Sequence, residues 1–175
     1  MDFHVSQILR EPMGSRREYD VAERCAGDVS AATSFPVEGH VTLLRTDAGI
    51  LTTADLASTV ETTCGRCLAP AHVPVDIHVE EEYYPTVDVI TGARLPEPEE
   101  PTPFLIDGHH ILNLCEAARQ QLILAEPMQP LCREDCAGLC PTCGSDRNLG
   151  QCACSASGTD ARWAALGSLL RGSDQ

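Results

Sequence analysis

The sequence contains no lysine, few aromatic residues and no apolar run long enough to cross a bilayer. All 12 Lys and Arg positions of the 175-residue chain are arginine, against 26 acidic residues, so the formal net charge is -14. Contacts from basic side chains to phosphates dominate nucleic-acid affinity, so a chain this acidic is a poor candidate for broad, direct binding of RNA or DNA. The charge favours basic partners, although acidity that only maintains solubility explains the composition equally well.

Two further absences bear on location and on the core. The first ten residues lack the basic region and long apolar stretch of a secretion signal, and no segment approaches the roughly 18 apolar residues of a transmembrane helix, so we expect a cytoplasmic protein. Aromatic residues make up only 4% of the chain, so Val, Leu, Ile and Ala must supply most of the core. A bound metal is a plausible structural supplement to such a core.

Cysteine, in contrast, is abundant, and eight of the ten residues form four closely spaced pairs. The pairs are Cys64 with Cys67, Cys132 with Cys136, Cys140 with Cys143, and Cys152 with Cys154. In a reducing compartment such pairs more often hold metal or carry redox chemistry than form structural disulfides, and eight thiolates suffice for two tetrahedral zinc sites. A disulfide framework is the competing explanation for an even number of cysteines, and Cys25 and Cys115 remain outside the pairs.

The clearest metal signal is the motif Cys140-Pro-Thr-Cys143-Gly. A turn of this kind directs two thiolates and backbone N–H groups at one ion, as in zinc ribbons. Cys152 and Cys154 form the nearest second pair, so these four cysteines are predicted to form the first zinc site.

The two remaining pairs are predicted to form a second zinc site. Cys64 and Cys67 fall in the connection between two predicted strands, whereas Cys132 and Cys136 follow a predicted helix. Neither pair completes a tetrahedral site alone, and together they would clamp the end of the helix to the sheet. Cys136 and Cys154 could exchange places between the two sites. Either arrangement predicts close to two zinc atoms per chain.

Together, the strand, helix and cysteine patterns predict an α+β fold. An antiparallel β meander or partly closed barrel carries one packed helix and a C-terminal zinc-ribbon-like segment. The clearest period-two pattern runs over residues 73–83. The segment from Val37 and residues 50–63 are predicted as an antiparallel pair joined by a turn at 46–49. Residues 3–9 are also predicted as a strand.

An acidic, mobile loop is predicted over about residues 85–108, because its five prolines exclude a helix interior or a central strand. From Asp76 to Asp107 there are nine acidic residues and one arginine, a pattern typical of a solvated face.

These elements divide the chain into two parts: residues 1–128, with the sheet, helix and loop, and residues 129–175. The second part holds the cysteine-rich segment and a short helix over residues 160–170, and is expected to pack on the first.

The helix before the cysteine-rich segment is predicted to have Asn113 as its N-cap, with Glu116 completing a capping box, and to end at Pro127. Cys115 falls on the apolar side of this helix. A core thiol is expected there rather than a metal ligand.

No catalytic constellation accompanies these elements. The six histidines form no metalloprotease spacing, the cysteine pairs leave no open zinc position, and a thioredoxin-like pair needs a βαβ context that Cys64 lacks. We therefore predict a protein that is not an enzyme. Two other roles stay open: a zinc ribbon that binds RNA, although only Arg133 and Arg147 flank the cysteines, and a thiol-based redox-responsive regulator.

Several segments resemble the YceD family of large ribosomal RNA subunit accumulation proteins, in particular its longer, cysteine-rich bacterial members. The matching segments are 63–68 (Thr-Cys-Gly-Arg-Cys-Leu), 124–127 (Leu-Ala-Glu-Pro), 130–144 with its four cysteines, the pair Cys152 and Cys154, and 160–163 (Asp-Ala-Arg-Trp). The resemblance covers most of the chain from about Val37. Arg147 and Ala161 depart from the family pattern, and they bear on local packing more than on metal binding.

The resemblance implies a role in the synthesis, processing or stability of 23S ribosomal RNA. Genes of the family often neighbour the gene of a small, basic, zinc-binding protein of the large subunit. A basic ribosomal protein or a large-subunit precursor is therefore the expected partner, and the chain would act as an assembly factor or escort. Direct RNA contact stays open, and neither a membrane nor a small-molecule substrate is expected.

Overall fold

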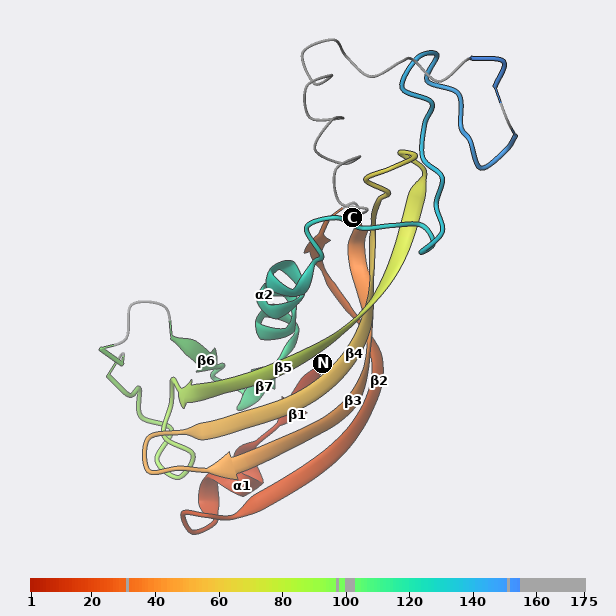
Figure 1. Cartoon of the computed structure of the whole chain (residues 1–175). Coiled ribbons are helices and arrows are strands. Elements are labelled where there is room, and N and C mark those ends of the chain that lie inside the picture. Colours follow the sequence, from red (N-terminus) through yellow and green to blue (C-terminus); the bar gives the residue numbers. More distant parts are fainter. Residues whose placement is uncertain (31, 97, 100–102, 151, 155–175) are drawn as a thin grey trace, which may run out of the picture. The chain divides into compact units, whose positions relative to one another are not determined.

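The computed structural model describes residues 1–175 except 31, 97, 100–102, 151 and 155–175, and Figure 1 shows its elements. The described strands are β1 (Asp2–His4), β2 (Arg16–Val29), β3 (Ala32–Arg45), β4 (Ile50–Thr63), β5 (Pro70–Pro85), β6 (Phe104–Ile106) and β7 (Ile111–Asn113). The described helices are α1 (Ser6–Arg10) and α2 (Cys115–Ala125), and neither is long and apolar enough to span a membrane. The helix expected over residues 160–170 lies outside the described residues.

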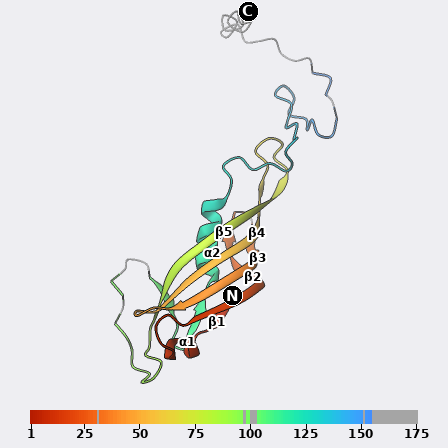
Figure 2. The same ribbon diagram turned by 60° about the horizontal axis from the view of Figure 1, so that its bottom comes forward.

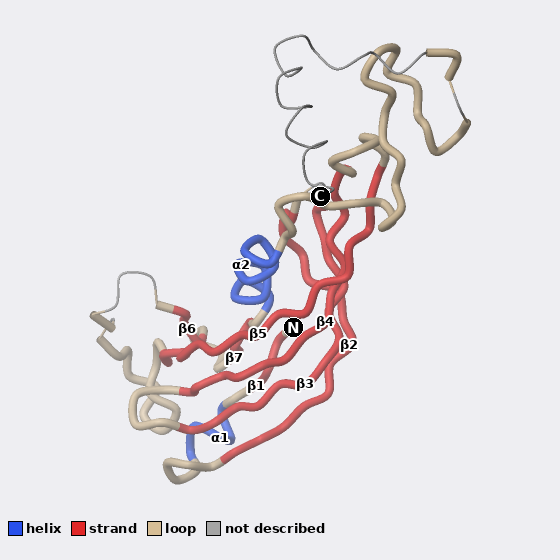
Figure 3. Tube along the Cα trace, in the orientation of Figure 1, coloured by secondary structure: helices blue, strands red, loops and turns tan. Residues whose placement is uncertain are grey.

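Five strands form one curled sheet in the order β2-β3-β4-β5-β6. The four long strands, β2 to β5, pair antiparallel as a meander, and Figures 1 and 2 show them side by side with a common curvature. β6 adds to β5 in parallel, and β1 and β7 form a separate antiparallel pair. Figure 3 shows α2 as the longer of the two described helices, so the predicted α+β meander with one packed helix is confirmed.

The chain divides into two compact units. The first consists of Met1–Gly65 and Ala69–Glu134, and the second consists of Arg66–Leu68 and the described residues from Asp135 onward. The sheet and both described helices belong to the first unit. The second unit has neither a helix nor a strand among its described residues; it is built from turns, with an isolated β-bridge between Leu139 and Asp146.

One side of the meander is apolar and builds the core of the first unit. Along β4 every second side chain from Ile50 to Val60 is buried, and β5 continues the pattern with Ile77, Val79 and Tyr83. α2 packs against β2 and β5 and buries its alanine-rich side. The alternation predicted over residues 73–83 is therefore confirmed, and the strand predicted over residues 50–63 is present as β4. The other side of the meander is left exposed.

The beginning of α2 differs from the predicted capping box. Asn113 closes β7, and Leu114 is the N-cap residue, without a side-chain cap. The Asn113 side-chain oxygen accepts a hydrogen bond from the backbone N–H of Cys115 at 3.0 Å. The Glu116 carboxylate accepts two hydrogen bonds from Arg119 instead, and these lower the pKa of Glu116 to about 2. Because Arg119 occupies this carboxylate, no capping box forms.

The N-terminal part of the chain also differs from the predicted strand over residues 3–9. Only residues 2–4 are a strand there, and Ser6–Arg10 form α1. The 14-residue strand β2 is not predicted by hydrophobic alternation. The reason is that charged side chains, Arg17 and Glu23, occupy positions paired with the buried residues of β3.

The predicted acidic loop is shorter than residues 85–108. It ends at β6, where the fully buried Ile106 joins the core. An isolated bridge between Val87 and Arg94 also orders its first half. The proline-rich centre is a loop where it is described, as the composition predicts.

Cys115 lies in the core, as predicted, but not as a thiol. It forms a disulfide with Cys25 of β2, 90 residues earlier, and their Cα atoms are 5.4 Å apart. One pair of cysteines therefore follows the competing disulfide explanation, while the other eight do not pair in this way among the described residues.

Candidate metal centres

The first cysteine cluster begins in the turn between β4 and β5. Cys64 directly follows β4, and its backbone N–H donates a hydrogen bond to the carbonyl of Ala69 at 2.8 Å, which closes the turn. Leu68 has a φ of 61°, a left-handed conformation that lets the chain reverse within a few residues. Cys64 and Cys67 are thus carried on one tight turn of a hairpin, where the sequence predicts them.

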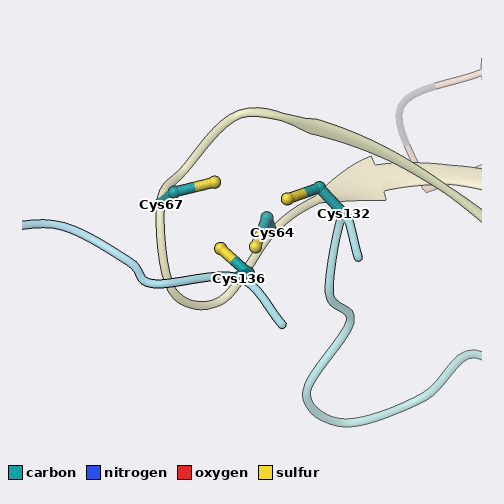
Figure 4. Close-up of side chains that lie close together, drawn as sticks. All are labelled: Cys64, Cys67, Cys132 and Cys136. Carbon is teal, nitrogen blue, oxygen red and sulfur yellow. The ribbon is translucent and has the colours of Figure 1, made fainter. Parts of the chain in front are cut away.

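Two more cysteines of this cluster come from the segment after α2. The backbone N–H of Gly65 donates a hydrogen bond to the carbonyl of Pro130 at 2.8 Å, which holds that segment beside the turn. The cluster, called the knuckle cluster below, consists of Cys64, Cys67, Cys132 and Cys136. Their sulfur atoms all lie within 4.8 Å of one another, and Figure 4 shows them directed toward a common centre. Cys132 is exposed, whereas the other three are buried.

Polar groups around Cys136 hold it in place. The Asn148 side-chain N–H donates a hydrogen bond to the Cys136 sulfur at 3.5 Å, and the Asn148 side-chain oxygen accepts one from the backbone N–H of Ala137 at 2.8 Å. The Arg66 guanidinium donates to the carbonyl of Cys136 at 3.0 Å. Partners of this kind orient metal ligands, and the spacing of the cysteines gives no signal for Asn148.

The second cluster, called the ribbon cluster below, consists of Cys140, Cys143, Cys152 and Cys154, whose sulfur atoms also lie within 4.8 Å of one another. A small turn presents the first two. The N–H of Gly144 donates to the carbonyl of Cys140, and the N–H of Cys140 donates to the carbonyl of Ser145, both at 2.8 Å. Gly144 has a φ of 72°, which glycine adopts without a steric penalty.

The surroundings of the ribbon cluster favour a thiolate at some sulfurs and a thiol at others. Hydrogen bonds from the backbone N–H groups of Cys143 and Thr142 lower the pKa of Cys140 to about 6. The Ser145 hydroxyl, 3.1 Å from the Cys143 sulfur, lowers the pKa of Cys143, whereas the nearby Cys143 raises the pKa of Cys154 to about 11. Four sulfurs this close cannot all be anionic without a cation, and a divalent ion would permit it.

Both clusters therefore fit a soft metal ion. Each offers four sulfur ligands, the donor set of a closed structural site, and tetrahedral sulfur sets favour zinc or iron–sulfur chemistry. The structure brings together the same two sets of pairs that spacing predicts. Within the described part of the chain, no histidine or carboxylate joins either set at the same separation.

Comparison with known proteins relates these features to one family. The sequence model described as "Large ribosomal RNA subunit accumulation protein YceD" matches residues 52–170. Uncharacterized proteins of Mycobacterium tuberculosis and Mycobacterium bovis are 33% identical over 97 residues, which is 55% of this chain and 44% of each relative. The match thus spans less than half the length of these curated relatives. No solved structure matches the chain.

Proposed function

The chain belongs to the YceD family of large ribosomal RNA subunit accumulation proteins, and from this membership we propose that it is a non-enzymatic factor of large-subunit biogenesis that supports the accumulation or processing of 23S ribosomal RNA. The observation that carries the proposal is the extent of the family match, because residues 52–170 include all eight cysteines of the knuckle and ribbon clusters. A four-sulfur site offers no open position to a substrate, which supports a structural use of the clusters.

Depleting the protein in its host is expected to lower the ratio of mature 23S to 16S ribosomal RNA and to increase large-subunit precursors. The ratio is measured on total RNA, and the precursors by sedimentation of ribosomal particles. The 16S RNA and the small subunit serve as internal controls, and expression of the intact chain should restore the ratio. An unchanged ratio after complete depletion would contradict the proposal.

We further propose that each cluster binds one zinc ion. Zinc bound by four thiolates contributes folding energy and does no chemistry of its own. In the knuckle cluster the ion would join the turn after β4 to the segment after α2, and in the ribbon cluster it would close a segment built from turns. Cys64, Cys67, Cys132 and Cys136 are the ligands proposed for the first ion, and Cys140, Cys143, Cys152 and Cys154 for the second.

The partner, in this proposal, is a basic protein of the large subunit that binds the exposed side of β3, β4 and β5, called the outer face below. Five exposed acidic residues define it: Glu38, Asp55, Glu61, Asp76 and Glu80. Within the described chain, the outward positions of these three strands carry no arginine. A surface of one sign attracts basic partners and repels nucleic acid.

Histidines partly balance one row of this charge. The strand register aligns Asp20, His40, Asp55 and His78 across β2 to β5. The Asp20–His40 and Asp55–His78 pairs are hydrogen bonded at 3.0 and 2.7 Å, and the bond that the Asp55 carboxylate accepts raises the pKa of His78. The carboxylates of this row are already bonded to histidines, so the carboxylates beside the row are more available to bind a cationic partner.

Glu38 and Asp76 are two such carboxylates, and they flank a shallow depression. Both lie level with Ala57 in the strand register, on either side of it, and Gly39 is adjacent. Because the side chain of Ala57 between them is only a methyl group, little fills the surface there, and the two carboxylates border the depression. An arginine or lysine side chain placed there would meet both, and arginine can do so with its planar fork of donors.

Reversing these two charges tests the partner. The variant Glu38→Lys with Asp76→Lys is expected to bind individually purified basic proteins of the host's large subunit at least about tenfold more weakly at physiological salt. The control, Asp47→Lys with Glu99→Lys, changes the net charge equally away from the outer face and should have little effect. Equal losses in both variants would contradict the assigned surface. Tight binding of bare ribosomal RNA without binding of basic proteins would instead support the RNA-binding alternative.

A further inference from the structure

Cys25 and Cys115 stand apart from the two clusters, and they join the edge strand β2 to the helix α2. Cys25 lies opposite Phe35 of β3 and is 1% exposed, whereas Cys115 begins α2 and is 9% exposed. Both belong to the apolar core of the first unit. We propose that this disulfide is a redox-dependent staple of the fold, formed by exchange with a small-molecule disulfide and then shielded by the core from reductants.

The two elements are in close contact beside the disulfide. Gly27 follows Cys25 by two residues, and a Cβ atom built on it would lie 2.8 Å from the Arg119 side chain. Arg119 is one helical turn after Cys115, so the absence of a side chain at Gly27 lets α2 approach β2 at this level. This contact does not depend on the S–S bond. The two thiols should therefore already face each other in the reduced chain.

Closing the bond requires an oxidant, and a small disulfide such as oxidised glutathione supplies one. The bond forms in a chain in which α2 is separated from β2, because the packed core excludes the oxidant as it excludes reductants. One cysteine thiolate then attacks the glutathione disulfide, releases a glutathione thiolate and forms a mixed disulfide. The second cysteine then attacks its partner's sulfur, closes the Cys25–Cys115 bond and releases the second glutathione. The two cysteines lose two electrons, the oxidant gains them, and the two thiol protons pass to the glutathione thiolates.

Reduction runs through the same steps in reverse, and it requires a thiolate to reach one sulfur of the bridge. The small exposures of Cys25 and Cys115 deny that approach while α2 is packed on the sheet. Reduction must therefore wait for α2 to separate from β2, and such openings of core elements are rare. The staple can then persist in surroundings that keep the cluster cysteines as thiolates.

Trapping of thiols tests the bond and its protection. The metal-loaded full chain is exposed to oxidised glutathione, quenched with acid, treated with an alkylating agent that caps remaining thiols, and digested without reduction. The digest is expected to contain a cross-linked peptide pair with Cys25 and Cys115. With a phosphine reductant, the bond should break at least about 100-fold more slowly in the native chain than in denaturant. Recovery of both residues as alkylated thiols would overturn the proposal, and so would equal rates of reduction.

Thermal unfolding tests the stapling effect. A bond that closes a loop of 90 residues restricts the unfolded chain, so the oxidised protein should melt roughly 10 °C above the reduced protein. The double variant Cys25→Ala with Cys115→Ala keeps both clusters, and its melting temperature should not respond to the reductant. Metal content is measured in every sample, so loss of an ion is recognised separately. Equal melting temperatures for oxidised and reduced protein with full metal content would overturn the proposal.

Discussion

Replacing Cys64 and Cys67 together by serine is expected to lower the zinc content from about two atoms per chain to about one. The change removes two of the four sulfurs of the knuckle cluster, and two thiolates with two hydroxyls are a poor ligand set for zinc. Structural zinc sites bind with apparent free energies of about 10 kcal/mol or more near neutral pH, so losing half of the ligands empties the site. The ribbon cluster shares no ligand with it and should keep its ion.

The zinc content is measured by elemental analysis after dialysis against a weak chelator. Cobalt substitution gives a second reading, because the absorption of tetrahedral cobalt thiolate reports how many such sites remain. The matched control carries the same kind and number of changes in the ribbon cluster. A variant of Cys64 and Cys67 that still binds two ions, or binds none, would contradict two independent sites.

The same variant should also lose stability around the turn after β4. Hydrogen bonds also hold this region, among them the backbone bonds from Cys64 to Ala69, from Gly65 to Pro130 and from Leu139 to Arg66. Without the ion they must do so alone, and hydrogen bonds near solvent contribute only about 1 kcal/mol each. Thermal unfolding of the sheet is therefore expected at least about 10 °C lower.

Much of the sheet could be predicted because its residues alternate. β5 is buried on one side and polar on the other, so a pattern of period two identifies it. β4 is identified by its content of Thr, Leu and Val after the turn at 46–49. β2 is as long as β4, but Arg17 and Glu23 interrupt its apolar side. A strand at the edge of a sheet tolerates such charges because solvent remains within reach. The pattern is then lost from the sequence although the strand is present.

The cysteine pairs differ in the same way. Some can be predicted from their spacing in the sequence, and others are formed only by contacts between distant segments. Short spacing identifies Cys140 with Cys143, since a tight turn alone brings their sulfurs together. No spacing rule relates Cys25 to Cys115, because only the packing of α2 on β2 makes them neighbours. The contact from Asn148 to Cys136 is hidden for the same reason, since turns of the folded chain create it.

Replacing Cys140 and Cys143 by serine is expected to remove one zinc ion as well, but to leave the melting of the sheet nearly unchanged. The described residues around the ribbon cluster form turns and one isolated β-bridge, held by local hydrogen bonds such as those between Cys140 and Ser145 or Gly138 and Arg147. A segment with so few bonds depends on its ion for order. The far-ultraviolet signal of the strands should therefore melt within about 2 °C of the unchanged protein.

Trypsin can report the two clusters separately, because each contains arginine between its ligands. Arg66 and Arg133 lie inside the knuckle cluster and Arg147 inside the ribbon cluster. Serine at Cys140 and Cys143 should speed cleavage after Arg147 at least about tenfold and leave the other two sites slow. Serine at Cys64 and Cys67 should do the reverse. If either variant exposed all three arginines, the clusters would have to exchange ligands, and two independent closed sites could not be maintained.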